Sequence, residues 1–119
     1  MENRLQRILD APERNSDILL STLQNINKNE ILSMLDKIIS YLNTGLTDKR
    51  AQSDLKTQQL DQKLQYKKNI LLCFTKLIDI CGPAETIPVI ANSSLQHESS
   101  HVRLEALNVI IAALLRHEN

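Results

Sequence analysis

The chain has 119 residues, of which 42% are hydrophobic and 24% are charged, as in a folded globular domain. It contains two glycines and three aromatic residues, and its apolar positions are mainly Leu and Ile; this excludes an all-β domain and argues against a glycine-rich nucleotide-binding domain. Basic and acidic residues balance at 14 each, so the basic excess of a non-specific nucleic-acid binder is missing.

Neither a membrane span nor a secretory signal is expected. No apolar run reaches the ~18 residues that cross a bilayer, and the first residues lack the apolar core of a signal peptide. Cys73 and Cys81 are eight residues apart in one predicted helix, a separation of about 12 Å that is too long for a disulfide. We therefore expect two buried free thiols and a reducing compartment, the cytoplasm or the nucleus.

The first predicted elements are short helices. One runs over about 4–9 and ends near Pro12, and a second extends to residue 26 from an N-cap within 15–17. A third helix is predicted over 30–43, because Ile31, Leu35, Ile38, Ile39 and Leu42 form one helical stripe. Asn27 and Glu30 resemble a capping box at its start, and Gly45 is its expected stop.

The composition then becomes polar over 46–69. This segment holds few aliphatic residues and neither Gly nor Pro, and composition leaves open whether it extends the next helix or forms a loop. A strongly periodic helix follows over 70–81. Gly82-Pro83 ends it, because Gly allows a left-handed cap and Pro cannot continue the hydrogen-bond ladder.

Two helices complete the chain. The first covers about 84–96, with a kink or a restart expected at Pro88. The second covers about 100–116 and is apolar on two sides, so we expect it to be buried against more than one neighbour. One side carries Val102, Ala106, Val109, Ile110, Ala113 and Leu114; the other carries Leu104, Leu107, Ile111 and Leu115.

The segment from Pro83 onward resembles a HEAT repeat, with armadillo repeats as a related alternative. The resemblance lies in a proline near the start of one helix, a short polar turn, and Val-Arg-x-x-Ala-Leu opening the next helix. The matching residues are Pro88, Leu95, Val102, Arg103, Ala106, Leu107 and Ile110. In this arrangement the Arg103 side chain is expected to reach an acceptor in the turn or in the adjacent repeat.

The resemblance implies an all-α fold in which antiparallel helical hairpins stack as a short HEAT- or armadillo-like α-solenoid; a compact helical bundle is the alternative. Residues 1–119 then form a single domain. It would contain a partial repeat over 1–26, a repeat over 27–82 with the polar insert 46–69, and a repeat over 83–117. Such repeats bury one another's faces, so the chain is expected to belong to a larger assembly or a longer solenoid.

One pentapeptide matches a metalloprotease pattern. His97, Glu98 and His101 form H-E-x-x-H, but zinc chemistry requires one continuous helix and a third ligand. Here the motif falls in the predicted inter-helix turn, where Ser99 or Ser100 serves better as an N-cap. We therefore reject a zinc site, and a zinc peptidase is the enzymatic competitor that metal analysis would test.

No other set of residues indicates catalysis. The two cysteines lack a C-x-x-C spacing or a histidine partner, and no nucleophile–base–acid set can be assembled. The sequence therefore predicts a protein that is not an enzyme and that needs no cofactor.

The HEAT-like segment predicts a protein–protein interaction scaffold that binds through the outward residues of its second helices. The candidate binding residues are Lys68, Thr75, Lys76, Asp79, Glu105 and Asn108. Self-association through the apolar C-terminal helix is a further expectation. The competing function is a nucleic-acid- or microtubule-associated module that uses the basic stretch 49–68, although its small charge excess makes nucleic acid the weaker reading.

Overall fold

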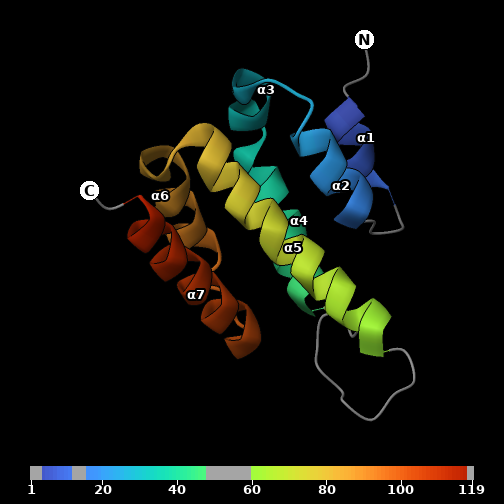
Figure 1. The fold of residues 1–119 in the computed structure, drawn as a ribbon. Helices are drawn as coiled ribbons and strands as arrows, with labels where there is room; N and C mark the ends of the chain where they lie inside the picture. Colours follow the sequence, from blue (N-terminus) through green and yellow to red (C-terminus); the bar gives the residue numbers. More distant parts are fainter. Residues whose placement is uncertain (1–3, 12–15, 48–59, 118–119) are drawn as a thin grey trace.

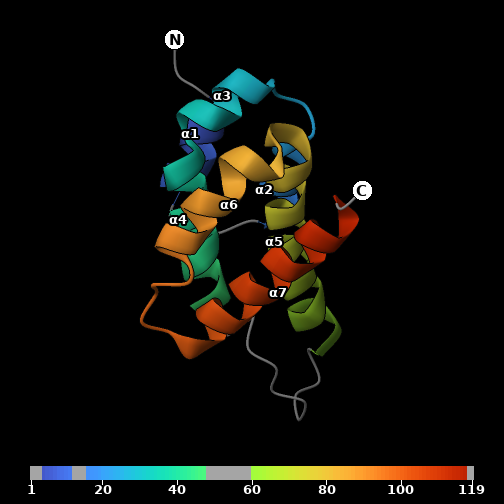
Figure 2. The same ribbon diagram turned by 90° about the vertical axis from the view of Figure 1, so that its left-hand side faces the viewer.

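Helix α5 lies at the centre of an all-helical fold. The computed structural model describes residues 4–11, 16–47 and 60–117, and every regular element in these ranges is an α-helix. The helices are α1 (Arg4–Asp10), α2 (Ser16–Leu23), α3 (Lys28–Ser33), α4 (Leu35–Thr47), α5 (Leu60–Cys81), α6 (Pro83–Ser93) and α7 (Ser100–Arg116). Figure 1 shows α5 between α1 and α2 on one side and α6 and α7 on the other. The turned view in Figure 2 shows α7 crossing in front of α5.

The core is built around the buried face of α5. Apolar residues recur every three or four positions on this face, so each turn of the helix places an apolar side chain against the neighbouring helices. The buried apolar residues among the described side chains of α5 are Tyr66, Ile70, Cys73, Phe74, Leu77, Ile78 and Cys81. They pack in one cluster with buried residues of the other helices, among them Leu5, Leu19, Ile38, Leu42 and Val102. The helix predicted over 70–81 is therefore confirmed, and it begins ten residues earlier than predicted.

The expected stop at Gly45 is wrong. Helix α4 continues through this glycine to Thr47, and Gly45 is buried against α5. A Cβ atom at this position would lie 2.8 Å from Cδ1 of Ile70 and 3.2 Å from the hydroxyl oxygen of Tyr66. Gly45 therefore allows close packing of two helices; it does not supply a left-handed cap.

The single helix predicted over 30–43 is two helices in the structure. The Asn27 cap is confirmed, because its side chain accepts a hydrogen bond from the Glu30 N–H at 2.9 Å. However, Met34 leaves helical geometry, with φ −122° and ψ 15°, and separates α3 from α4. No Gly or Pro marks this point, so tertiary packing sets the bend: α3 lies against α5, whereas α4 contacts both α5 and α6.

Three other predicted helix boundaries can be compared with the structure. Helix α2 begins at Ser16, within the predicted cap region, but it ends at Leu23 and not at residue 26. Gly82, with φ 91°, separates α5 from α6 as predicted. Helix α6 continues through Pro88, so a restart there is wrong. Pro88 has no N–H group to donate to the carbonyl oxygen of Ala84, four residues earlier. The loss of this hydrogen bond is tolerated because both residues are exposed to water.

The polar segment 46–69 divides between elements. Residues 46 and 47 belong to α4, and residues 60–69 are the first part of α5. Residues 48–59 lie outside the described residues. Within the described part of the segment, the helix-extension alternative is therefore confirmed.

Side-chain amides connect the helices across the core. Asn43 on α4 is buried, donates to the Ser93 hydroxyl at 2.9 Å and accepts from the Ser94 hydroxyl at 2.6 Å. On α5, the buried amide of Asn69 donates to the carboxylate of Asp17 on α2. Because these buried polar groups have partners, they fix the register of α4 against α6 and of α2 against α5.

The turn before α7 has the predicted organisation. Ser99 is the N-cap, and its hydroxyl accepts from the Val102 N–H at 3.4 Å. Arg103 donates through Nη1 to the carbonyl oxygens of His97 and Glu98, at 2.6 and 3.0 Å. The expectation that Arg103 reaches an acceptor in the turn is therefore met.

The helices form a compact globule. The radius of gyration is 14.0 Å, close to the ~13.5 Å expected of a globular chain of this length. The all-α class is therefore confirmed for the described residues. Among those same residues, no helix combines the length and apolar character needed to cross a bilayer.

Candidate interaction surface

Helices α5 and α7 lie side by side and run in the same direction. Near their N-terminal ends, Lys67 Nζ lies 3.4 Å from Glu105 Oε1; near their C-terminal ends, Arg116 Nη2 lies 3.0 Å from Asp79 Oδ1. Figure 1 shows the two helices running in the same direction, and Figure 2 shows that α7 crosses α5 at an angle. Because the ion pairs join them at both ends, α5 and α7 present one continuous outer surface.

A shallow depression of about 390 Å³ lies on the outer side of α5. It is lined by Lys67, Lys68, Leu71, Leu72 and Thr75. Leu72 is exposed and Leu71 is half-buried, so the depression has an apolar floor beside two lysines. Such a site suits an apolar side chain of a binding partner that has an acidic residue beside it.

The structure brings most of the predicted binding residues to this surface. Lys68, Thr75 and Asp79 follow one another on the outer side of α5, at spacings of seven and four residues. Lys76 is turned about 100° around the helix from Thr75 and is half-buried. On α7, Glu105 is half-buried at the junction with α5 and Asn108 is exposed.

Three of these candidates already have partners within the chain, because the Thr75 hydroxyl donates to the Leu71 carbonyl and two acidic candidates form ion pairs. Glu105 pairs with Lys67, and Asp79 pairs with Arg116 and lies 3.5 Å from Nε2 of His117. Their contacts join α5 to α7. Sequence reasoning missed Leu71 and Leu72. A search for apolar residues among the outward positions 68, 72, 75 and 79 would have found Leu72, whereas Leu71 adjoins it on the side of the core-facing stripe.

A second apolar surface lies on α7. The expectation that this helix is buried against more than one neighbour is met on one of its two apolar sides, and the described chain leaves the other side exposed. Val102, Ala106, Val109, Ile110 and Ala113 are buried, as the first side requires. The other positions, which include Leu114, are 44–67% exposed; they are Leu104, Leu107, Ile111, Leu114 and Leu115. The reason is that α7 lies at the edge of the fold, where α4, α5 and α6 cover one side of it.

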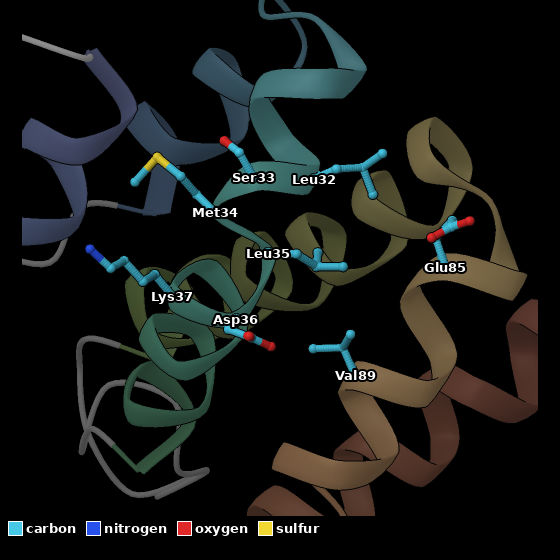
Figure 3. Close-up of a pocket in the computed structure, with 8 residues that line it drawn as sticks. All are labelled: Leu32, Ser33, Met34, Leu35, Asp36, Lys37, Glu85 and Val89. Carbon is cyan, nitrogen blue, oxygen red and sulfur yellow. The ribbon is translucent and has the colours of Figure 1, made fainter.

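Another depression, of about 460 Å³, lies between the α3–α4 corner and α6. Its lining comprises Leu32, Ser33, Met34, Leu35, Asp36, Lys37, Glu85 and Val89. Figure 3 shows the carboxylates of Asp36 and Glu85 at its margin, on different helices, whereas Ser33 and Lys37 point away from Glu85. The lining therefore brings no nucleophile and base together, and we assign no chemistry to this depression.

The H-E-x-x-H residues do not lie on one helix. His97 and Glu98 lie in the turn, and α7 begins only at Ser100, so His101 alone of the three is helical. The Nδ1 atom of His97 accepts a hydrogen bond from the Ser99 N–H at 3.0 Å. Among the described residues, no group of three or more His, Cys, Asp or Glu side chains is arranged to hold a metal ion.

Both cysteines are buried and free, as predicted. Burial raises the pKa of the Cys73 thiol to about 12, and the carboxylate of Asp17 contributes in the same direction. Burial also raises the pKa of Cys81. A raised pKa disfavours the reactive thiolate, so both residues act as small apolar side chains of the core.

Comparisons of this chain with protein-family models, with curated proteins and with solved structures find no match.

Proposed function

We propose that the chain is a non-catalytic protein–protein interaction module built from HEAT-like helical hairpins. It binds through the α5–α7 face, defined here as Lys67, Lys68, Leu71, Leu72, Thr75, Asp79, Glu105 and Asn108. The observation that carries this proposal is the apolar depression on α5, which lies on a surface formed by two helices that are joined by ion pairs.

The order of the helices supports the repeat interpretation. Helices α4 and α5 would form one hairpin, and α6 and α7 the next. Contacts join α4 to α6 and α5 to α7, as stacked repeats require of like helices, and they also join α5 to α6 and α4 to α7. The second helices, α5 and α7, then provide the binding face.

The chemistry of the α5–α7 face indicates the kind of partner. Leu71 and Leu72 provide the apolar contact, and Lys68 adds an exposed positive charge beside them. Lys67 has its charge balanced by Glu105. The face therefore fits a partner helix that carries aliphatic side chains with an acidic residue next to them. The two buried free thiols fit a module that works in a reducing compartment.

The test is binding by the full chain and by one variant. Proteins retained from a lysate are identified and purified, and each is titrated against the chain to give a Kd. We expect Leu72→Glu to weaken specific binding at least tenfold, because it places a carboxylate in the apolar contact and adds repulsion toward an acidic partner. Ile18→Glu is the matched control, because Ile18 is a comparably exposed apolar residue on α2.

Equal binding by wild type and Leu72→Glu would contradict the proposed face. The competing nucleic-acid or microtubule function is tested by titrating fluorescent oligonucleotides and tubulin polymers at rising salt. Binding that falls steeply with salt and is unchanged by Leu72→Glu would favour that function over ours. Lys67 belongs to the stretch 49–68 and is one of the residues there whose side chains are described. Its charge is already paired with Glu105.

A further inference from the structure

The exposed apolar residues of α7 form one ordered stripe. Leu104, Leu107, Ile111 and Leu114 follow at spacings of three, four and three residues, and Leu115 adjoins the last of them. This is the spacing at which one helix packs lengthwise against another. The stripe extends over about 16 Å along α7. No charged residue lies within it; Asn108 borders it on one side, and Arg103, which is bonded to the preceding turn, on the other.

The stripe borders the α5–α7 face at Asn108 and is otherwise separate from it. The residues of α7 that meet α5, Glu105 and Arg116, lie about 80–120° around the helix from Leu104 and Leu115. The buried residues Ala106 and Ala113 lie on the side opposite the stripe. Binding to the stripe therefore leaves the depression on α5 open.

We infer that the stripe is a contact between two copies of this chain, which pack α7 against α7 in antiparallel orientation. A two-fold dimer uses the same patch on both copies, and the uncharged stripe meets its own copy without repulsion. The antiparallel orientation also places the positive end of each helix dipole beside the negative end of the other.

The area of the stripe fits a dimer. Five aliphatic side chains, each about half exposed, present on the order of 400 Å² of apolar surface. Two copies would bury about 800 Å² of it, an area below the ~1,200 Å² of standard stable interfaces and typical of weak, transient ones. We therefore expect a reversible dimer and not an obligate one.

Antiparallel packing fixes which residues meet. With the two-fold axis at the middle of the stripe, near position 109, Leu107 of one copy lies opposite Ile111 of the other. Leu104 then lies opposite Leu114 and Leu115. Leu107 and Ile111 are the central positions, so a charge at either one has the largest effect.

The first experiment is sedimentation equilibrium of the full chain over a concentration series. We expect a monomer–dimer equilibrium for the wild type. Leu107→Lys and Ile111→Glu should each raise the dimer Kd at least tenfold, because each places two like charges near the axis. Both positions are exposed in the single chain, so helix content measured by circular dichroism should stay the same. Ile18→Lys adds the same charge elsewhere and should leave the Kd unchanged.

The double variant Leu107→Lys/Ile111→Glu tests the orientation. In the antiparallel dimer the lysine introduced at position 107 of one copy faces the glutamate introduced at position 111 of the other. We therefore expect the double variant to dimerise at least fivefold more tightly than Leu107→Lys alone. A parallel dimer would place like charges together and show no such recovery, which would overturn the inferred orientation.

A wild-type chain that stays monomeric at all concentrations would overturn the inference, as would a dimer that both single variants leave intact. Neither result bears on the proposed function, because Leu72→Glu alters the α5–α7 face and leaves the stripe unchanged. We expect Leu72→Glu to dimerise like the wild type.

Discussion

Helices α5 and α7 run side by side, yet their outer surfaces differ in character. Helix α5 contacts five other helices, α2, α3, α4, α6 and α7. Its outer surface carries Lys68, Thr75 and Asp79 around a single exposed apolar residue, Leu72. Helix α7 contacts three, α4, α5 and α6, and its outer surface is aliphatic. The helix with more neighbours thus has the more polar exterior. The apolar width of a helix therefore does not by itself give the number of its neighbours, because α7 has the wider apolar surface and the fewer contacts among the described helices.

The largest expected effect is on the free energy of unfolding. It distinguishes a buried residue of α5 from an exposed residue of α7. Phe74 is fully buried and Leu115 is the most exposed of the large apolar residues on α7. We expect Phe74→Ala to lower the free energy of unfolding by about 3–5 kcal/mol, through lost burial and a cavity. Leu115→Ala should change it by less than about 0.5 kcal/mol in dilute monomer. Urea unfolding measures both, and similar losses would mean that α7 is covered in the single chain.

The next effect depends on pH and concerns Cys73, which faces the core from α5. The pKa of its thiol is about 12 in the folded chain, against 9.0 as the ordinary value. The unfolded chain therefore loses this proton first as the pH rises. The contribution of the protonated Cys73 thiol to the free energy of unfolding is fully present below pH 9 and is lost as the pH rises toward 12. At pH 10 the free energy of unfolding is lower by about 1 kcal/mol for this reason.

This prediction is checked by urea unfolding at pH 8 and pH 10. Cys73→Ala has no thiol at this position, so its stability should fall less between the two pH values than that of the wild type. The comparison uses the change with pH, because the alanine variant also loses core volume at both pH values. Equal changes in the two proteins would show that Cys73 ionises alike in the folded and unfolded chains.

A smaller effect tests the contact between α4 and α5. Gly45→Ala places a methyl group against Cδ1 of Ile70, and we expect a net loss of about 1 kcal/mol once the better helix propensity of Ala is included. Ile70→Val removes that Cδ1 atom. In the Ile70→Val background Gly45→Ala should therefore cost less, and a double-mutant cycle measures the difference. Additive losses would contradict a direct clash.

The smallest effect concerns the ion pair at the junction of α5 and α7. Lys67 and Glu105 are partly exposed, so we expect Glu105→Gln to lower the free energy of unfolding by less than about 1 kcal/mol. The loss should shrink at high salt. A loss of several kcal/mol, or one insensitive to salt, would mean that the pair is more deeply buried than its exposure indicates.

Local chemistry was enough to predict several helix ends. Asn27, Ser99 and Gly82-Pro83 act within one turn of the chain, through a side-chain cap or a backbone restriction, so the sequence alone placed them correctly. Apolar periodicity likewise identified the helix over 70–81 and the helix over 100–116, because one-sided burial needs that spacing. The all-α class follows from the same signals.

The tertiary structure alone decided the features that depend on a distant neighbour. Gly45 is a contact point and not a stop because Ile70 and Tyr66 occupy the space beside it, and the bend at Met34 follows from packing against different helices. The two apolar sides of α7 are equivalent in the sequence. Only the arrangement of α4, α5 and α6 determines which side is buried, because an apolar residue contributes to the core only where another element covers it.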